Sequence, residues 1–217
     1  PYEGCILGYF TVWQGPENNV CDSLNIQKRN EVLIGWSKDG FHWNRENKKP
    51  FLPVSEDFHA WNAGNVQSTA GSPLIVGDSL YFYVSGRYNS KPKHDSNFAT
   101  GLAMLRRDGF VSMRAGRKEG YIEIKTQIPA NGNYLFVNAD VKGTLAVEVL
   151  DDNGQPMEGF TKKDCISMKK SDKTKQMISW EKHPGVTSLV GKTVRLKFYL
   201  NQADIYLSLI HISEPTR

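Results

Sequence analysis

The sequence has few cysteines, no long apolar run and little excess charge, and each shortage excludes a class of protein. Its three cysteines cannot all pair, and they show neither CxxC nor Cys/His metal spacing. Cys5 and Cys21 could form a disulfide in a secreted protein, but we favour free buried thiols for these two and for Cys165. No apolar run is long enough to cross a bilayer, so we expect no membrane span.

The net charge is +4, from 27 basic and 23 acidic side chains. No stripe of Lys and Arg with interleaved aromatics is present, which argues against a nucleic-acid partner, and the lysines between residues 162 and 175 fit a solvated hairpin. Asp151, Asp152 and Asp164 invite comparison with calcium ligands, but they fall in ordinary turn sequences. We therefore expect no cofactor, with a structural calcium ion as the alternative.

The chain is nevertheless rich enough in apolar residues to fold. A hydrophobic content of 39% supports two cores, and short apolar runs alternate with turn signals without a helix-length period. Beyond Gly116 the alternation becomes more regular, most clearly at residues 194–200. The sequence predicts an all-β protein with one domain at residues 1–117 and a second, a compact β-sandwich, at residues 118–206.

A tight turn lies at residues 37–43, which read SKDGFHW. Asp39 and Gly40 make the reversal, and the aromatic residues around them can pack beneath it. Such turns connect neighbouring strands and hold them together. We therefore expect a structural role for Asp39 rather than a catalytic one.

Two carboxylates stand at the starts of predicted strands, Glu3 and Glu31. If both strand starts face one channel, the pair suits glycoside hydrolysis, which needs one protonated carboxyl and one ionised carboxylate. Close approach would also push their pKa values apart. The alternative for Glu31 is a structural carboxylate paired with Arg29 or Lys28.

The loop that follows combines an aromatic ring with several amides. Sugars offer apolar faces for stacking and hydroxyl edges for hydrogen bonds, so this combination suits a sugar. The candidate substrate-binding residues are His59, Trp61, Asn62, Asn65, Gln67 and Arg87. In the alternative interpretation Trp61 is a core aromatic, the amides close turns around Gly64, and Arg87 is solvated.

Seven segments resemble bacterial proteins related to the five-bladed propeller glycosidases of the invertase (family 32) and arabinanase (family 43) group: PYEG, RNEVLIGWSKDGFHW, PFLPVS, WNAGNVQS, GDSLYFYVSGR, TGLAMLRRDGFVSM and YLFVNAD. The resemblance covers nearly all of residues 1–206. It implies a partial five-bladed β-propeller (its last blades) followed by a β-sandwich, a carbohydrate substrate, and an extracytoplasmic (periplasmic or secreted) location. It also implies a first-blade Asp outside this sequence, so we expect this chain to be inactive alone.

Residues 207–217 read LSLIHISEPTR, which looks like the translated adapter of a sequencing library. We expect them to be an artefact at the end of a metagenomic gene fragment. On that interpretation His211, Glu214 and Arg217 have no function.

Three functions from different classes remain open. The first is a glycoside hydrolase with Glu3 and Glu31 in its site. The second is a carbohydrate-binding propeller without turnover, which keeps the aromatic and amide residues but tolerates loss of either carboxylate. The third is a glycoside phosphorylase, which needs a cationic cluster. Candidates for that cluster are Arg87, Lys91, Lys93 and His94.

Overall fold

The computed structural model describes residues 1–26, 28–57, 59–89 and 96–211. Over these residues the chain consists mainly of strands, with one short α-helix and one 3-10 turn, so the all-β prediction is confirmed. The chain divides into two compact units, Pro1–Leu105 and Arg106–Arg217. No helix in the described ranges is long and apolar enough to cross a membrane.

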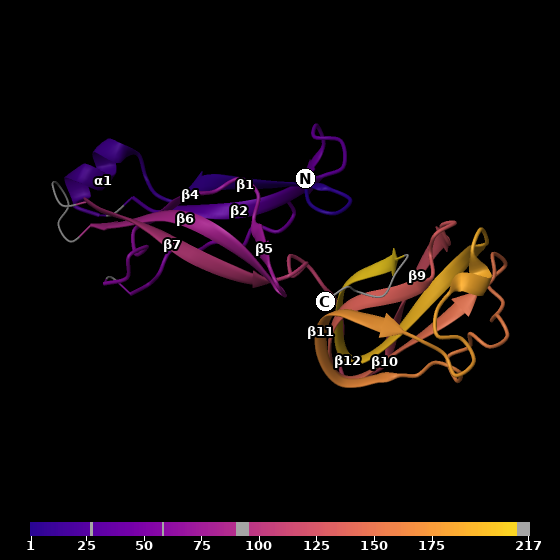
Figure 1. Cartoon of the computed structure of the whole chain (residues 1–217). Coiled ribbons are helices and arrows are strands. Elements are labelled where there is room, and N and C mark those ends of the chain that lie inside the picture. The colour runs from indigo at the N-terminus through magenta and orange to yellow at the C-terminus, as the bar shows by residue number, and fades with distance from the viewer. Residues whose placement is uncertain (27, 58, 90–95, 212–217) are drawn as a thin grey trace. The chain divides into compact units, whose positions relative to one another are not determined.

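The described strands of the first unit form one seven-stranded sheet. In chain order its elements are β1 (Ile6–Trp13), α1 (Asn18–Leu24), β2 (Asn30–Ser37), β3 (Trp43–Asn44), β4 (Asn65–Thr69), β5 (Leu74–Val76), β6 (Ser79–Asn89) and β7 (Ser96–Arg106). The spatial order is β1-β2-β4-β6-β5, with β3 beside β2 and β7 beside β6 (Figure 1). Strands β1 and β2 pair antiparallel, whereas β2 and β4 pair in parallel.

Apolar packing in the first unit is concentrated around three aromatic rings. Phe51 stacks on Tyr9 with ring centroids 5.7 Å apart, and Phe82 meets both rings edge-on. Along β6 the side chains of Leu80, Phe82 and Val84 are buried while Tyr83 is exposed, as the period-two alternation of a half-buried strand requires. Strand β7 instead carries exposed apolar side chains.

The described strands of the second unit form one five-stranded sheet. Its elements are β8 (Met113–Ala115), β9 (Gly120–Gln127), β10 (Tyr134–Leu150), β11 (Met168–Ile178), the 3-10 turn η1 (Thr187–Leu189) and β12 (Thr193–His211). Strands β10 and β12 pair along most of their length, and two register shifts in β10, between Asn138 and Ala139 and between Val141 and Thr144, bend the pair. The sheet therefore curls around its own core (Figure 1).

Trp180 lies at the centre of that core and is 1% exposed. Its Nε1 donates to the carbonyl of Val147 at 3.0 Å, and its ring meets Phe160 edge-on at 5.1 Å. The Sγ of Cys165 accepts a hydrogen bond from the Val147 amide at 3.2 Å, and burial raises the pKa of the Cys165 thiol. Cys165 is thus a structural thiol, and Cys5 and Cys21 are also free.

The second unit begins at Arg106, the last residue of β7. Arg106 donates from Nε to Asn138 at 2.8 Å and pairs with Asp172, while Asn138 donates to Asp108 at 2.9 Å. Strand β8 then pairs with β12. The second unit therefore includes residues that precede the boundary predicted at residue 117, because side-chain hydrogen bonds that strand periodicity does not reveal attach them to β10.

Strand β12 continues into the segment predicted to be an artefact. Residues Leu207–His211 pair with Tyr134–Asn138 of β10. Glu214 and Arg217 lie outside the described residues. The origin of residues 207–217 stays a prediction.

Candidate functional site

Four residues from four neighbouring strands form a row across one end of the first sheet. Trp13 of β1 pairs with Asn30 of β2, Asn30 pairs with Asn65 of β4, and Asn65 pairs with Arg87 of β6. Residues that are directly opposite in a sheet project from the same face. We call these four residues the polar row. It brings one indole, two amides and one guanidinium together at one end of the strands.

Asn65 is a buried residue of the polar row, and its side-chain oxygen lacks a hydrogen-bond partner in the part of the chain that the structure describes. Its side chain is 5% exposed overall, and its Oδ1 makes no hydrogen bond with the described residues. A cavity of about 40 Å³ is lined by Lys28, Gly64, Asn65 and Arg87. Buried polar atoms are nearly always hydrogen-bonded, and this volume can hold a water molecule or a hydroxyl group. The cavity therefore offers an acceptor beside two cationic donors.

Arg87 is held over this edge of the sheet by two contacts. Its Nη2 donates to the side chain of Gln67, and its guanidinium lies 4.8 Å from the ring centroid of Phe98. Gln67 occupies a register shift between Val66 and Ser68, and a bulge of this kind re-aims a side chain. Three predicted binding residues, Asn65, Gln67 and Arg87, are thus brought together.

Glu31 lies one residue after the polar row and is 4% exposed. Its Oε1 accepts from Arg29 Nη2 at 3.1 Å and from the Val54 amide at 3.3 Å. The same Nη2 donates to Glu56 at 2.9 Å, and the hydrogen bonds to Glu56 and to Glu31 raise the pKa of Arg29. The pairing of Glu31 with Arg29, proposed as the structural alternative, is therefore present.

Glu56 is a carboxylate that sequence reasoning missed. Because its Oε1 and that of Glu31 contact one Arg29 nitrogen at 2.9 and 3.1 Å, the two oxygens lie within about 6 Å of each other. Its side chain is 82% exposed, in contrast to that of Glu31. Glu56 follows the apolar run at residues 51–54 in a loop, and no local pattern connects it with Glu31.

Glu3 does not approach Glu31. It is exposed, in a turn with a left-handed φ of 49°, before β1. The antiparallel register joins Ile6 to Ser37 and Val12 to Glu31, so the start of β1 at Ile6 lies six residues, or about 20 Å, along the strand pair from Glu31, and Glu3 precedes Ile6. The sequence argument treated both strand starts as equivalent, but starts of antiparallel neighbours lie at opposite ends.

Trp61 packs on the sheet at two glycines. A Cβ added to Gly86 or Gly101 would lie 2.4 or 2.2 Å from the indole, so the ring rests directly on the backbone of β6 and β7. Trp61 is half-buried, which supports its interpretation as a packing residue. Asn62 donates from Nδ2 to the carbonyl of Pro53 at 3.3 Å, and His59 is exposed.

The turn at residues 37–43 has the structural role that its sequence predicts. Asp39 accepts from the side chain of His42 and from the backbone amides of His42 and Phe41, which hold the pKa of this carboxyl well below its usual range. Gly40 has a left-handed φ of 81°.

Within the described ranges, no group of three or more His, Cys, Asp or Glu side chains has a metal-binding arrangement.

Sequence reasoning also did not predict Lys28, Trp13 and Asn30 as binding residues. All three are distant from Asn65 in the chain. Strand register joins Trp13 and Asn30 to Asn65, and the cavity brings Lys28 beside it; neither arrangement has a local sequence signal. Lys91, Lys93 and His94, proposed for a phosphate-binding cluster, lie outside the described residues.

Comparisons with protein-family models, curated proteins and solved structures find no match to this chain.

Proposed function

We propose that the first unit binds carbohydrate at the polar row, as part of a glycoside hydrolase-like protein built from propeller blades and a sandwich-like bent sheet. The observation that carries the proposal is the unpartnered Oδ1 of Asn65 beside Lys28 and Arg87. A sugar hydroxyl both donates and accepts hydrogen bonds. In the cavity it donates to Asn65 and accepts from a cationic side chain.

Trp13 supplies the apolar half of this recognition. It is 41% exposed at the other end of the polar row, and its Nε1 donates to the carbonyl of Pro16 at 2.9 Å. A ring held by its own hydrogen bond loses little freedom when a sugar face stacks on it. The sugar then lies across the row, with its hydroxyl edge toward Asn65.

Glu31 and Glu56 supply the carboxylates that hydrolysis needs. The ion pair with the partly exposed Arg29 holds the buried Glu31 carboxylate in place, and we assign Glu31 the role of base or nucleophile. The exposed Glu56 has solvent access and suits the proton donor. The upper limit of about 6 Å between the two oxygens is compatible with the carboxyl spacing of about 5–5.5 Å in retaining glycosidases, whereas Glu3 is too remote.

Replacement of Asn65 by alanine tests the binding half of the proposal. Because Asn65 Oδ1 makes no internal hydrogen bond, Asn65→Ala should change the melting temperature little while weakening affinity for neutral oligosaccharides at least tenfold. The measurement is calorimetric titration with arabinan, fructan, xylan and galactan fragments. Asn153→Ala, in an exposed turn of the second unit, is the matched control. Unchanged affinity in Asn65→Ala contradicts the proposed binding site.

Glutamine substitutions in the full-length protein that the propeller resemblance implies, which would include the first-blade Asp, test the catalytic half by reducing-sugar release from the same glycans. Glu31→Gln and Glu56→Gln should abolish release and retain binding, whereas Glu3→Gln should be unaffected. A second candidate function, carbohydrate binding without turnover, is favoured by the two hydrogen bonds that tie Arg29 to both carboxylates as a structural bridge. Binding without release by the unmodified full-length protein supports that candidate.

A further inference from the structure

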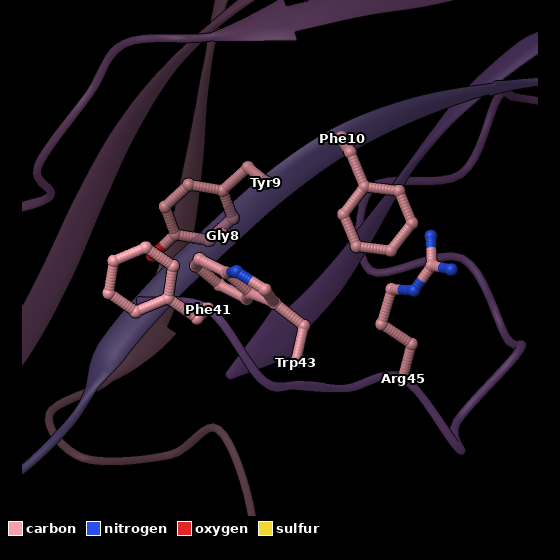
Figure 2. A pocket seen from close by; sticks show the side chains of 6 residues that line it. All are labelled: Gly8, Tyr9, Phe10, Phe41, Trp43 and Arg45. Atoms are coloured by element: carbon pink, nitrogen blue, oxygen red, sulfur yellow. The ribbon is translucent and has the colours of Figure 1, made fainter. Parts of the chain in front are cut away.

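A second pocket lies at the opposite end of the β1–β2 pair from the polar row. It has a volume of about 540 Å³ and is lined by Gly8, Tyr9, Phe10, Phe41, Trp43 and Arg45. Figure 2 shows the rings of Phe41 and Trp43 side by side, with Arg45 extending beside Phe10. Pockets of this volume accept small-molecule ligands.

Two glycines lie beneath the Trp43 and Arg45 side chains, which form the floor of this pocket. Gly8 and Gly35 are directly paired in the β1–β2 register. A Cβ on Gly8 would lie 2.5 Å from the Trp43 ring, and one on Gly35 would lie 3.0 Å from Cγ of Arg45. The two side chains therefore lie flat on adjacent backbones, and Trp43 is further fixed because its Nε1 donates to Gly40 at 3.0 Å. The floor is already ordered before any ligand arrives.

The upper surface of the pocket remains open. Trp43 is 39% exposed and Phe41 is 87% exposed, which is unusual for two neighbouring aromatic rings. The turn that carries them is held by the hydrogen bonds of Asp39 described above. Two exposed rings on a rigid turn form a stacking surface for a flat apolar face, such as the C–H face of a sugar ring.

Charge indicates which sugar fits. The guanidinium of Arg45 lies 5.4 Å from the Phe10 ring centroid, and no ion pair joins Arg45 to an acidic side chain in the described part of the chain. The segment from Lys38 to Lys49 carries four basic and two acidic residues. A guanidinium fork matches the two oxygens of a carboxylate.

We propose that this pocket is a second carbohydrate site, selective for an acidic sugar residue whose ring stacks on Phe41 and Trp43 and whose carboxylate binds Arg45. The site is separate from the polar row and does not use Asn65. It suits a uronate-containing polysaccharide, which the two sites would bind at opposite ends of one strand pair. Neither the propeller resemblance nor the polar row requires such a site.

The test is calorimetric titration of the chain with α-1,4-linked trigalacturonate and with α-1,4-linked galactotriose, which differ only by oxidation at C6. We expect at least tenfold tighter binding of trigalacturonate. Phe41→Ala should weaken that binding at least tenfold, and its high exposure means that little packing is lost. Arg45→Gln should abolish the preference for the acidic trimer, and Arg45→Lys should restore only part of it because the fork is lost.

Matched variants separate this site from the polar row. Tyr83→Ala removes another exposed ring of the same sheet and should leave trigalacturonate binding unchanged. Asn65→Ala should also leave it unchanged, so failure of the polar-row proposal would not affect this result. Equal affinity for the two trimers, or full affinity in Phe41→Ala, would overturn the proposal.

Discussion

The second unit buries most of its large apolar side chains and exposes few, whereas the first leaves many of its own exposed. One continuous core in the second unit includes Trp180, Phe198 and Leu145, each at most 1% exposed. In the first unit the exposed side chains include Phe98 at 72% and Met104 at 66%. The difference indicates that the second unit is self-sufficient and that the first needs a covering surface.

The sheet edges differ in the same way. Strand β11, at one edge of the second sheet, carries Lys169, Lys170, Lys173 and Lys175. Lysines on an edge strand oppose pairing with another sheet. Strand β7, at an edge of the first sheet, instead exposes Phe98, Leu102 and Met104. The first unit therefore presents an edge that favours association, and both proposed carbohydrate sites belong to this unit.

Association through β7 is the largest effect that the comparison predicts. We expect the chain to dimerise or aggregate, and we expect Leu102→Lys with Met104→Lys to give a monomer, since both side chains are exposed and the change imitates β11. Light scattering after size-exclusion chromatography measures the mass. A monomeric parent chain would refute this prediction.

Trp180→Ala tests the core of the second unit. Loss of a fully buried indole and of its hydrogen bond to Val147 should lower the free energy of unfolding by about 3–5 kcal/mol. Urea denaturation monitored by circular dichroism measures the change. A loss below about 1 kcal/mol would mean that the second core is not tightly packed around Trp180.

Moving the start of the second unit from residue 106 to residue 118 should lower its stability, by less than Trp180→Ala does. A fragment of residues 106–206 keeps β8 and the contacts of Arg106, whereas a fragment of residues 118–206 loses them. With several hydrogen bonds removed, the shorter fragment should be less stable by about 2–4 kcal/mol. Thermal unfolding of both fragments measures the difference. Equal stability would show that residues 106–117 do not support the second unit.

Gly101→Ala tests packing in the first unit. The new Cβ would lie 2.2 Å from the Trp61 ring, so the indole must move, at a cost of about 1–3 kcal/mol. Gly71→Ala is the control, because nothing lies within 4 Å of its Cβ position. Chemical denaturation compares the two. A Gly101→Ala effect no larger than that of Gly71→Ala would mean that Trp61 does not pack there.

The smallest predicted effect is the titration of Asp39. Its pKa lies below the ordinary Asp value near 4, so its stabilisation of the turn is present above that pH and is lost only as the pH falls through the lower folded value. The ¹³C resonance of the Asp39 side-chain carboxyl should therefore show no protonation midpoint between pH 7 and about pH 4. A midpoint near pH 4 would show that Asp39 does not hold the turn.

Local sequence patterns predicted the strands and the tight turn, because alternation and Asp-Gly chemistry act within a few residues. They did not predict the polar row, since Trp13, Asn30 and Asn65 meet only through strand register. The pairing of Glu3 with Glu31 failed for the same reason: antiparallel order separates two strand starts that look equivalent in the sequence. Glu56 lies in a loop, and its partner Arg29 gives no local signal.

The most direct test of the central claim is amide chemical-shift mapping of the chain during titration with a neutral oligosaccharide that binds in calorimetry. We predict perturbation at Lys28, Asn65 and Arg87, loss of that perturbation in Asn65→Ala, and none in residues 106–206. Perturbation confined to the second unit would contradict the account, because it would assign carbohydrate binding to the self-sufficient unit rather than to the first.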